Sequence, residues 1–247
     1  MNNFTFYCPT KFVFGKDQEK NVGKLCAEQG ATKVLIVYGG GSVVRSGLLD
    51  RVRQYIQDEG IATVDFGGAQ PNPRVEHVRE GIEIVKREGV DFLLAIGGGS
   101  VIDTAKGIGI GALYDGDVWD YFLRTKNPTV MMPVGAIVTI AASGSEGSSS
   151  CVLNNDALKV KSACNNDCIR PRFAIMNPEL TYTLPAYQTA CGVVDIMMHT
   201  HERYFTPVQD NEFTDEFCEG LLRTMIKLGP KAISDPYNYN VRAQIMW

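Results

Sequence analysis

The sequence predicts an α/β fold whose parallel sheet is followed by a run of helices. Short apolar runs such as Lys33–Tyr38 and Phe92–Ile96 alternate with segments of helical periodicity, which is the pattern of a parallel sheet buried on both faces. Glycine-rich turns follow both of these runs directly. Beyond residue 178 the periodicity is helical throughout. We therefore expect a parallel-sheet domain over residues 1–178 and the incomplete beginning of an all-helical domain over 179–247.

Composition narrows the class of protein. The 247 residues are 45% apolar and 21% charged, which is ordinary for a globular chain. A net charge of −4 provides no basic field for nucleic acid or an anionic membrane, and the N-terminus lacks the architecture of a signal peptide. Seven cysteines occur without a CxxC pair, so we expect reduced thiols in a cytoplasmic protein.

The first third of the chain predicts a β-α-β unit. Asn3–Phe14 contains two short β-type pieces around Pro9 and is expected to form an edge hairpin. A helix over Glu19–Gln29 precedes the strand Lys33–Tyr38, and a helix over Leu48–Glu59 precedes the strand Ala62–Phe66. The turn after the first strand holds three glycines and Ser42, at the place where a Rossmann-like fold binds a dinucleotide.

The second glycine turn is the stretch around which the chain is organised. The strand Phe92–Ile96 leads into Gly97, Gly98, Gly99 and Ser100, and then into a helix over Val101–Leu113. Glycines let the backbone approach an anion, and the helix N-terminus favours negative charge. This pattern predicts a phosphate-binding corner; the alternative is a tight turn without a ligand. Asp103, in the first helical turn, contacts either the helix dipole or a ligand.

Several residues between these elements are further candidates. Asn72 lies between two prolines, either with its amide free for a ligand or as part of a simple turn. A helix over Val75–Glu88 leaves His77 outside its apolar stripe, which predicts a surface histidine. Ala141–Ser150 is small and polar, and the hydroxyls of Thr139, Ser143 and Ser145 near it favour a cofactor-lining loop over a disordered linker.

The missing acid after Lys33–Tyr38 bears on cofactor choice. A carboxylate there would bind a ribose diol, whereas glycine and serine leave room for a 2′-phosphate. The sequence therefore favours NADP(H) over NAD(H).

A metal-type pair follows in the helical part, on a helix over Thr189–Phe205. Asp195 and His199 are four residues apart, about 40° round the helix, so they share a face. A carboxylate and an imidazole suit Fe²⁺ or Zn²⁺. The alternative is a hydrogen-bonded Asp–His pair. Apolar neighbours such as Val194 and Met198 predict that this helix is largely buried, and two ligands are too few for a complete site.

The order and spacing of several motifs now identify a family. They are YGGGS at 38–42, PNP at 71–73, GGGSVIDTAK at 97–106, SGSE at 143–146, RPRFAIMNPELTYTLP at 170–185 and GVVDIMMH at 192–199. With these the chain resembles the iron-containing (group III) alcohol dehydrogenases over its whole length. The resemblance is strongest to the branch of butanol dehydrogenases and NADP-dependent aldehyde reductases.

The resemblance implies hydride transfer between a nicotinamide and a primary alcohol or aldehyde, with Fe²⁺ or Zn²⁺ polarising the substrate oxygen. By position, Gly97–Ser100 would hold the pyrophosphate, and Gly40, Gly41 and Ser42 would surround the adenosine ribose with its 2′-phosphate. Thr139 and Ser143 would line the cofactor, and Lys161 would reach a ribose. Asp195 and His199 would be the first two metal ligands of an enzyme that is a homodimer in its full-length form.

Two departures from the family pattern shape the expectation. Ala141 and Ser143 stand where relatives often carry Pro and Thr, which should matter little. Relatives supply two more metal-binding histidines, but this sequence has none after His201. We therefore expect a C-terminally truncated chain that binds metal weakly, aggregates and oxidises little alcohol. The alternatives are an enzyme like glycerol dehydrogenase or dehydroquinate synthase, against which YGGGS and NPELTYTLP argue, and a nucleotide-binding module without activity.

Overall fold

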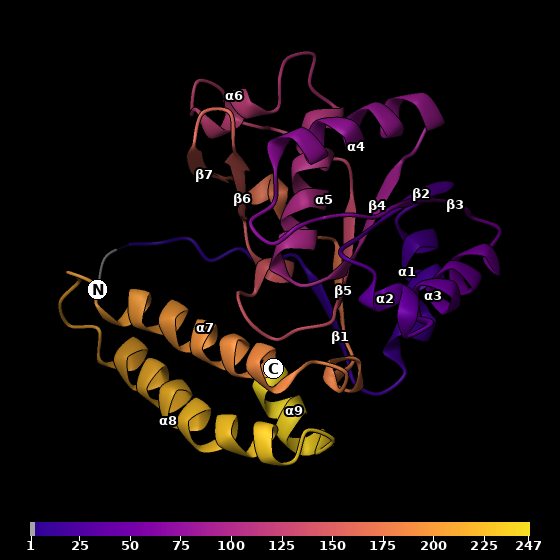
Figure 1. The fold of residues 1–247 in the computed structure, drawn as a ribbon. Coiled ribbons are helices and arrows are strands. Elements are labelled where there is room, and N and C mark those ends of the chain that lie inside the picture. The colour runs from indigo at the N-terminus through magenta and orange to yellow at the C-terminus, as the bar shows by residue number, and fades with distance from the viewer. Residues whose placement is uncertain (1–2) are drawn as a thin grey trace. The chain divides into compact units, whose positions relative to one another are not determined.

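The structure, a computed structural model, describes residues 3–247 and divides into two compact units (Figure 1). One unit comprises Cys8–Val138 and Ser145–Met176 and holds the sheet. The other comprises the N-terminal residues up to Tyr7, Thr139–Gly144 and Asn177–Trp247, and it is mainly helical. The chain as a whole has the predicted α/β fold class, with the sheet first and the helices after it.

A six-stranded parallel sheet forms the centre of the first unit, in the order β1-β8-β5-β4-β2-β3. The strands are β1 (Lys11–Phe14), β2 (Lys33–Tyr38), β3 (Ala62–Phe66), β4 (Phe92–Gly97), β5 (Val134–Val138) and β8 (Phe173–Met176). The middle strands β4, β5 and β8 are buried along their whole length. This confirms the apolar runs as strands covered on both faces.

Helices cover both faces of the sheet (Figure 1). On one side lie α4 (Val75–Glu88) and α5 (Gly99–Ala112), and on the other lie α1 (Val22–Glu28), α2 (Ser42–Arg45) and α3 (Leu48–Gln57). The boundaries of α4 match the expectation, while α5 begins two residues before Val101 because the glycine turn is already helical. The core between α4, α5 and the sheet includes Leu93, Ile102 and Ile108.

Smaller elements complete this unit. After α6 (Trp119–Phe122), the strands β6 (Ser150–Asn155) and β7 (Val160–Asn165) pair antiparallel in a hairpin of their own. β5 begins directly after Pro133, whose nitrogen carries no N–H to donate to the ladder. Short 3₁₀ turns are η1 (Gln18–Asn21), η2 (Ser145–Gly147) and η3 (Asp167–Ile169).

The N-terminal hairpin expected over Asn3–Phe14 is wrong. β1 pairs parallel with β8, from Lys11 opposite Phe173 to Phe14 opposite Met176. The residues from Asn3 to Pro9 form no strand, and the rings of Phe4 and Phe6 are exposed. β1 pairs along its whole length with β8, a strand far away in the sequence. Turn signals between neighbouring segments do not reveal such a distant partner.

The second unit is built on two long helices that pack side by side, α7 (Ala186–Tyr204) and α8 (Glu212–Ser234) (Figure 1). The turn η4 (Pro178–Thr181) precedes them and α9 (Tyr239–Met246) follows. Their common core contains Val193, Met225, Leu228, Ala232, Val241 and Ile245. No helix within residues 3–247 is both long and apolar enough to cross a membrane.

Candidate functional site

The two glycine turns lie next to each other at the carboxyl edge of the sheet. β2 pairs with β4 in parallel, with Tyr38 opposite Ile96, so Gly39 and Gly97 leave the sheet side by side. The chain passes from β2 outward to β3 and then returns across β2 to β4. The strand order therefore reverses between β2 and β4, and such a switch point is where open α/β sheets bind their ligands.

The second turn presents an uncapped helix start to this edge. Gly98, the N-cap of α5, is extended (φ −95°, ψ −170°) and provides no side-chain cap. A Cβ on Gly97 would lie 2.5 Å from a methyl carbon of Val101, so only glycine fits there. The free N–H groups and helix dipole of a 14-residue helix suit a phosphate group.

The first turn is open and carries positive charge. A Cβ on Gly40 would meet no atom within 4 Å, and both Gly40 and Ser42 are exposed. Gly41 has φ +94°, and a Cβ there would lie 3.4 Å from Nη1 of Arg45. Within residues 3–247 no carboxylate forms an ion pair with Arg45, so its guanidinium is available to an anion beside Ser42.

Two residues that the sequence suggested separately meet in the structure. Nζ of Lys161 on β7 donates to Oδ1 of Asn72, with 2.9 Å between the two atoms. Asn72 adopts a left-handed backbone conformation, with φ 54°. Both side chains are exposed, and the pair joins positions 89 residues apart in the chain.

Asp103 points into the protein. Its Oδ1 accepts from the Ser145 hydroxyl (2.6 Å) and its Oδ2 from the Val152 N–H (3.1 Å). Burial raises the pKa of this carboxyl, and nearby Lys106 opposes that shift. Both carboxylate oxygens therefore have partners inside the protein. The sequence had left open whether Asp103 interacts with the helix dipole or with a ligand.

Sequence reasoning missed Lys106, which lies on the same helix and is completely buried. The available signal was a lysine within the largely apolar helix sequence VIDTAKGIGIGA, because a buried ammonium requires a set of acceptors.

Thr139 and Ser143 belong to the helical unit, in the segment Thr139–Gly144. α7 packs closely on that segment: a Cβ on Gly192 would lie 2.4 Å from the carbonyl oxygen of Ala141. The segment with the two expected lining hydroxyls is thus fixed against the helix that carries the expected metal ligands, and Gly192 is one turn before Asp195.

Asp195 and His199 share one face of α7. Oδ2 of Asp195 and Nε2 of His199 are 3.8 Å apart, which is too long for a hydrogen bond, and Oε2 of Glu202 lies 3.5 Å from Nδ1 of His199. The expectation of a largely buried helix is wrong: these two side chains are 46% and 40% exposed, and Val194 and Met198 are exposed as well. Apolar residues occur on several faces of α7, but only one of these faces packs against α8, so the apolar residues on the other faces stay exposed.

The donor set at this face suits a divalent cation in kind but not in number. A catalytic metal takes at least three protein ligands in addition to an open position. Across residues 3–247 no three His, Cys, Asp or Glu side chains are arranged to hold a metal ion. The described residues therefore fit part of a metal site and not a complete one.

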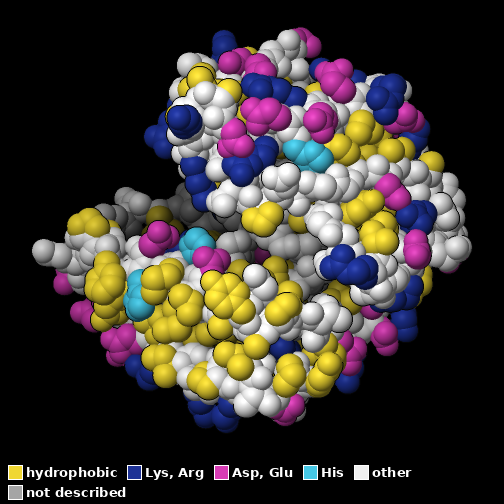
Figure 2. All heavy atoms as spheres, in the orientation of Figure 1, with side chains coloured by type: hydrophobic (Ala, Val, Ile, Leu, Met, Phe, Trp, Pro, Cys, Tyr) yellow, Lys and Arg dark blue, Asp and Glu magenta, His cyan; other side chains and the backbone are white. Residues whose placement is uncertain are grey.

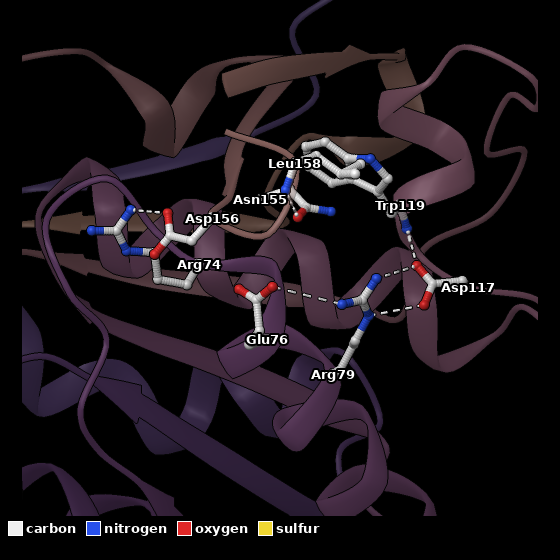
Figure 3. Close-up of polar contacts among 8 residues, drawn as sticks. All are labelled: Arg74, Glu76, Arg79, Asp117, Trp119, Asn155, Asp156 and Leu158. Carbon is white, nitrogen blue, oxygen red and sulfur yellow. Dashed lines mark hydrogen bonds and ion pairs between the residues drawn. The ribbon is translucent and has the colours of Figure 1, made fainter. Parts of the chain in front are cut away.

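A polar hollow elsewhere is less suited to ligand binding. It lies between α4 and the β6–β7 turn, and Figure 3 shows Arg74 paired with Asp156 across it and Arg79 paired with Asp117 nearby. His77, expected at the surface, instead stacks on Phe66 with its side chain 19% exposed. The charged walls of the hollow already have partners in the protein.

Comparisons with known proteins agree on one family. The sequence profile of the family "Iron-containing alcohol dehydrogenase" matches residues 9–178. The chain is 42% identical over 247 residues to a probable NADH-dependent butanol dehydrogenase of Bacillus subtilis, covering all of this chain and 64% of that protein. It is 39% identical to the NADPH-dependent aldehyde reductase of Escherichia coli, again covering 64% of the relative.

A solved structure gives the same result for the fold. The crystal structure of the NADH-dependent butanol dehydrogenase A of Thermotoga maritima superposes with a TM-score of 0.97 at 37% identity. The match covers 100% of this chain and 62% of that one. The chain thus spans slightly less than two thirds of the length of these relatives.

Proposed function

Because the chain belongs to the iron-containing alcohol dehydrogenase family, we propose that it binds NADP(H) and serves the interconversion of primary alcohols and aldehydes. The observation that carries the proposal is the pair of glycine turns at the switch point between β2 and β4. Bound NADP(H) supplies or accepts the hydride. Butanol is the first substrate to test, since the relatives are named for it.

The residues of the chain bind and orient the cofactor. We propose that Gly97, Gly98, Gly99 and Ser100 hold the pyrophosphate at the start of α5, where the backbone N–H groups are free of a side-chain cap. Gly40, Gly41 and Ser42 surround the adenosine ribose. Thr139 and Ser143 are proposed to line the cofactor, and Lys161, which donates to Asn72, is proposed to reach a ribose. In this assignment residues 1–178 form the dinucleotide domain.

The preference for NADP(H) rests on charge. Ser42 can donate to a 2′-phosphate, and Arg45 beside Gly41 adds an unpaired cation within the described chain. The relatives are named for both cofactors, NADH in Bacillus and NADPH in Escherichia, so direct binding decides the preference for this chain.

Asp195 and His199 are proposed as two ligands of Fe²⁺ or Zn²⁺ in the helical domain, residues 179–247. Because the described donors stop at two, a nucleotide-binding chain without turnover is the alternative function. The seven free cysteines are compatible with the cytoplasmic location that the sequence suggests, and a homodimer of the full-length form stays part of the proposal.

The decisive experiment titrates NADPH into the chain and its Gly40→Val variant. A side chain at Gly40 has free space in the fold but occupies the place of the ligand, so we expect affinity to fall more than tenfold with an unchanged Tm. Gly220→Val on α8, where a Cβ would meet only Arg223 at 4.0 Å, is the control and should bind as the native chain does.

Turnover separates the two functions. Butanal reduction with NADPH is followed with and without added Fe²⁺ or Zn²⁺. Metal-dependent turnover supports the oxidoreductase, while tight NADPH binding without turnover supports the nucleotide-binding alternative. Equal binding by native protein and Gly40→Val would contradict the proposed position of the cofactor.

A further inference from the structure

Lys106 is a completely buried cation in the middle of α5. Its neighbours along the helix, Ala105 and Ile108, belong to the apolar core. Burying an ammonium ion costs several kcal/mol unless hydrogen bonds and charges compensate it. A lysine at this position therefore has to be matched by a dedicated set of oxygen atoms.

That set comes from one short segment, residues 145–150. Nζ of Lys106 donates to the carbonyl oxygens of Ser145 (2.6 Å), Ser148 (3.0 Å) and Ser150 (2.9 Å), and it lies 3.0 Å from the Ser145 hydroxyl oxygen. All four atoms act as acceptors, and the ammonium form of the lysine offers three N–H bonds to them, one more than the neutral amine would. The segment thus places four oxygen atoms within hydrogen-bond distance of one cation.

Asp103 holds the same segment from one helical turn earlier. Its Oδ1 accepts from the Ser145 hydroxyl, and its Oδ2 accepts from the N–H of Val152. The Ser145 hydroxyl thus donates to Asp103 and accepts from Lys106, and its side chain is almost fully buried. Hydrogen bonds of Asp103 and Lys106 therefore connect α5 to Ser145 at the start of the segment, to Ser150 at its end and to Val152 just beyond it.

We propose that Lys106, with Asp103, is a positioning residue for the cofactor site: it holds residues 145–150 in one shape without touching the cofactor. The inference rests on the proposed function, because α5 opens with the glycine turn assigned to the pyrophosphate and the segment follows Ser143 closely in the chain. The stretch GGGSVIDTAK then has two tasks. Its first residues face the ligand, and its last residues preorganise a second loop.

Hydrogen exchange tests the structural half in the absence of cofactor. In Lys106→Met we expect the amides of residues 145–152 to exchange at least tenfold faster, while those of the central strand β4 keep their rates. Ser145→Ala, which removes the hydroxyl shared by Asp103 and Lys106, should show a smaller change in the same segment. This milder variant keeps the test valid if Lys106→Met does not fold.

Affinity at several salt concentrations tests the positioning role. The Kd for NADPH should rise at least tenfold in Lys106→Met. The salt dependence of this Kd should equal that of the native chain, because a lysine that does not contact the ligand contributes nothing to the salt dependence. Lys161→Met removes a proposed ligand contact and should weaken the salt dependence.

The inference is overturned by native exchange rates in both variants, by an unchanged Kd in Lys106→Met, or by a weakened salt dependence there, which would mean direct contact. A native chain that does not bind NADPH would instead overturn the proposed function. The exchange experiment distinguishes the two failures, since it uses no cofactor.

Discussion

Single side chains at the two edges of the sheet differ in whether they have hydrogen-bond or ion-pair partners within the protein. At the carboxyl edge, Ser42 and Arg45 are exposed and have no carboxylate partner within residues 3–247. At the amino edge, Asp91 is fully engaged: it accepts from the N–H groups of Thr32 and Lys33 and from the Thr32 hydroxyl. Substitutions at the carboxyl edge should therefore change cofactor binding, and substitutions at the amino edge should change stability.

At the carboxyl edge, Ser42→Asp should narrow or reverse the preference for NADPH over NADH. The new carboxylate repels a 2′-phosphate and can accept from a ribose diol. Kd values for both cofactors, measured by fluorescence titration, check this. Arg45→Gln should weaken the binding of NADPH but leave the binding of NADH unchanged, because only NADPH carries the 2′-phosphate. Equal affinities of the native chain for the two cofactors would contradict the cofactor assignment.

At the amino edge, Asp91 should make stability depend on acid. Burial raises the pKa of this carboxyl, but hydrogen bonds from Thr32 and Lys33 outweigh burial, so the folded-state pKa is lowered. The stabilisation is therefore present above the unfolded pKa of about 4 and is lost as the pH falls through the folded value. Asp91→Asn should cost about 1–2 kcal/mol at pH 7.

Urea unfolding of both proteins between pH 7 and pH 2 tests this prediction. The stability gap between native chain and Asp91→Asn should narrow below about pH 4, as the carboxylate protonates. A gap of constant size down to pH 2 would contradict it. NADPH affinity should not change, since Asp91 lies at the edge of the sheet opposite the glycine turns.

Among the elements, α7 packs against the segment Thr139–Gly144 through a close contact at Gly192. Gly192 lets the helix contact the backbone of Ala141, and a methyl group there would need the two segments to separate. The cost of such overpacking is typically about 1–3 kcal/mol. Because the shift would also move Thr139–Gly144, it reaches the residues proposed to line the cofactor.

Gly192→Ala should accordingly lower the Tm and weaken NADPH binding. Gly220→Ala on the neighbouring helix α8 is the matched control, because its Cβ would meet only the end of Arg223. There the gain in helix propensity, about 1 kcal/mol, should raise the Tm. Thermal melts of the two variants should thus move in opposite directions, and a shared direction would argue against the close contact between Gly192 and Ala141.

At the scale of the whole molecule, the helical unit exposes a large apolar surface. The exposed side chains on α7 and α8 include Tyr187, Val194, Met198, Phe213, Phe217 and Ile226. Figure 2 shows hydrophobic side chains gathered over the region of these two helices. Contiguous apolar surface of this kind promotes association and dye binding.

The 247-residue chain should therefore bind the dye ANS in its folded state and sediment as larger species at higher concentration. Replacing Phe213 and Phe217 with Glu should reduce both effects, since both rings are more than two thirds exposed and leave the core intact. Replacing the exposed polar residue Gln244 with Glu is the control for added charge. Equal ANS fluorescence in the double variant and the native chain would contradict this.

Short patterns in the sequence were sufficient to predict much of the local secondary structure. Lys33–Tyr38, Ala62–Phe66 and Val75–Glu88 formed as the patterns predicted, because apolar periodicity and glycine act over a few neighbouring residues. The motif order also indicated the family to which the chain belongs. These signals are local, so they can be read without knowing which segments meet.

Which segments contact one another became known only from the three-dimensional structure. It set the strand order that brings the two glycine turns together, joined β1 to β8, and placed Lys161 against Asn72. It also buried Lys106 among serine carbonyls and left one face of α7 uncovered. Contacts between residues far apart in the chain depend on how whole elements pack, and no periodicity within a single segment records the identity of its distant partner.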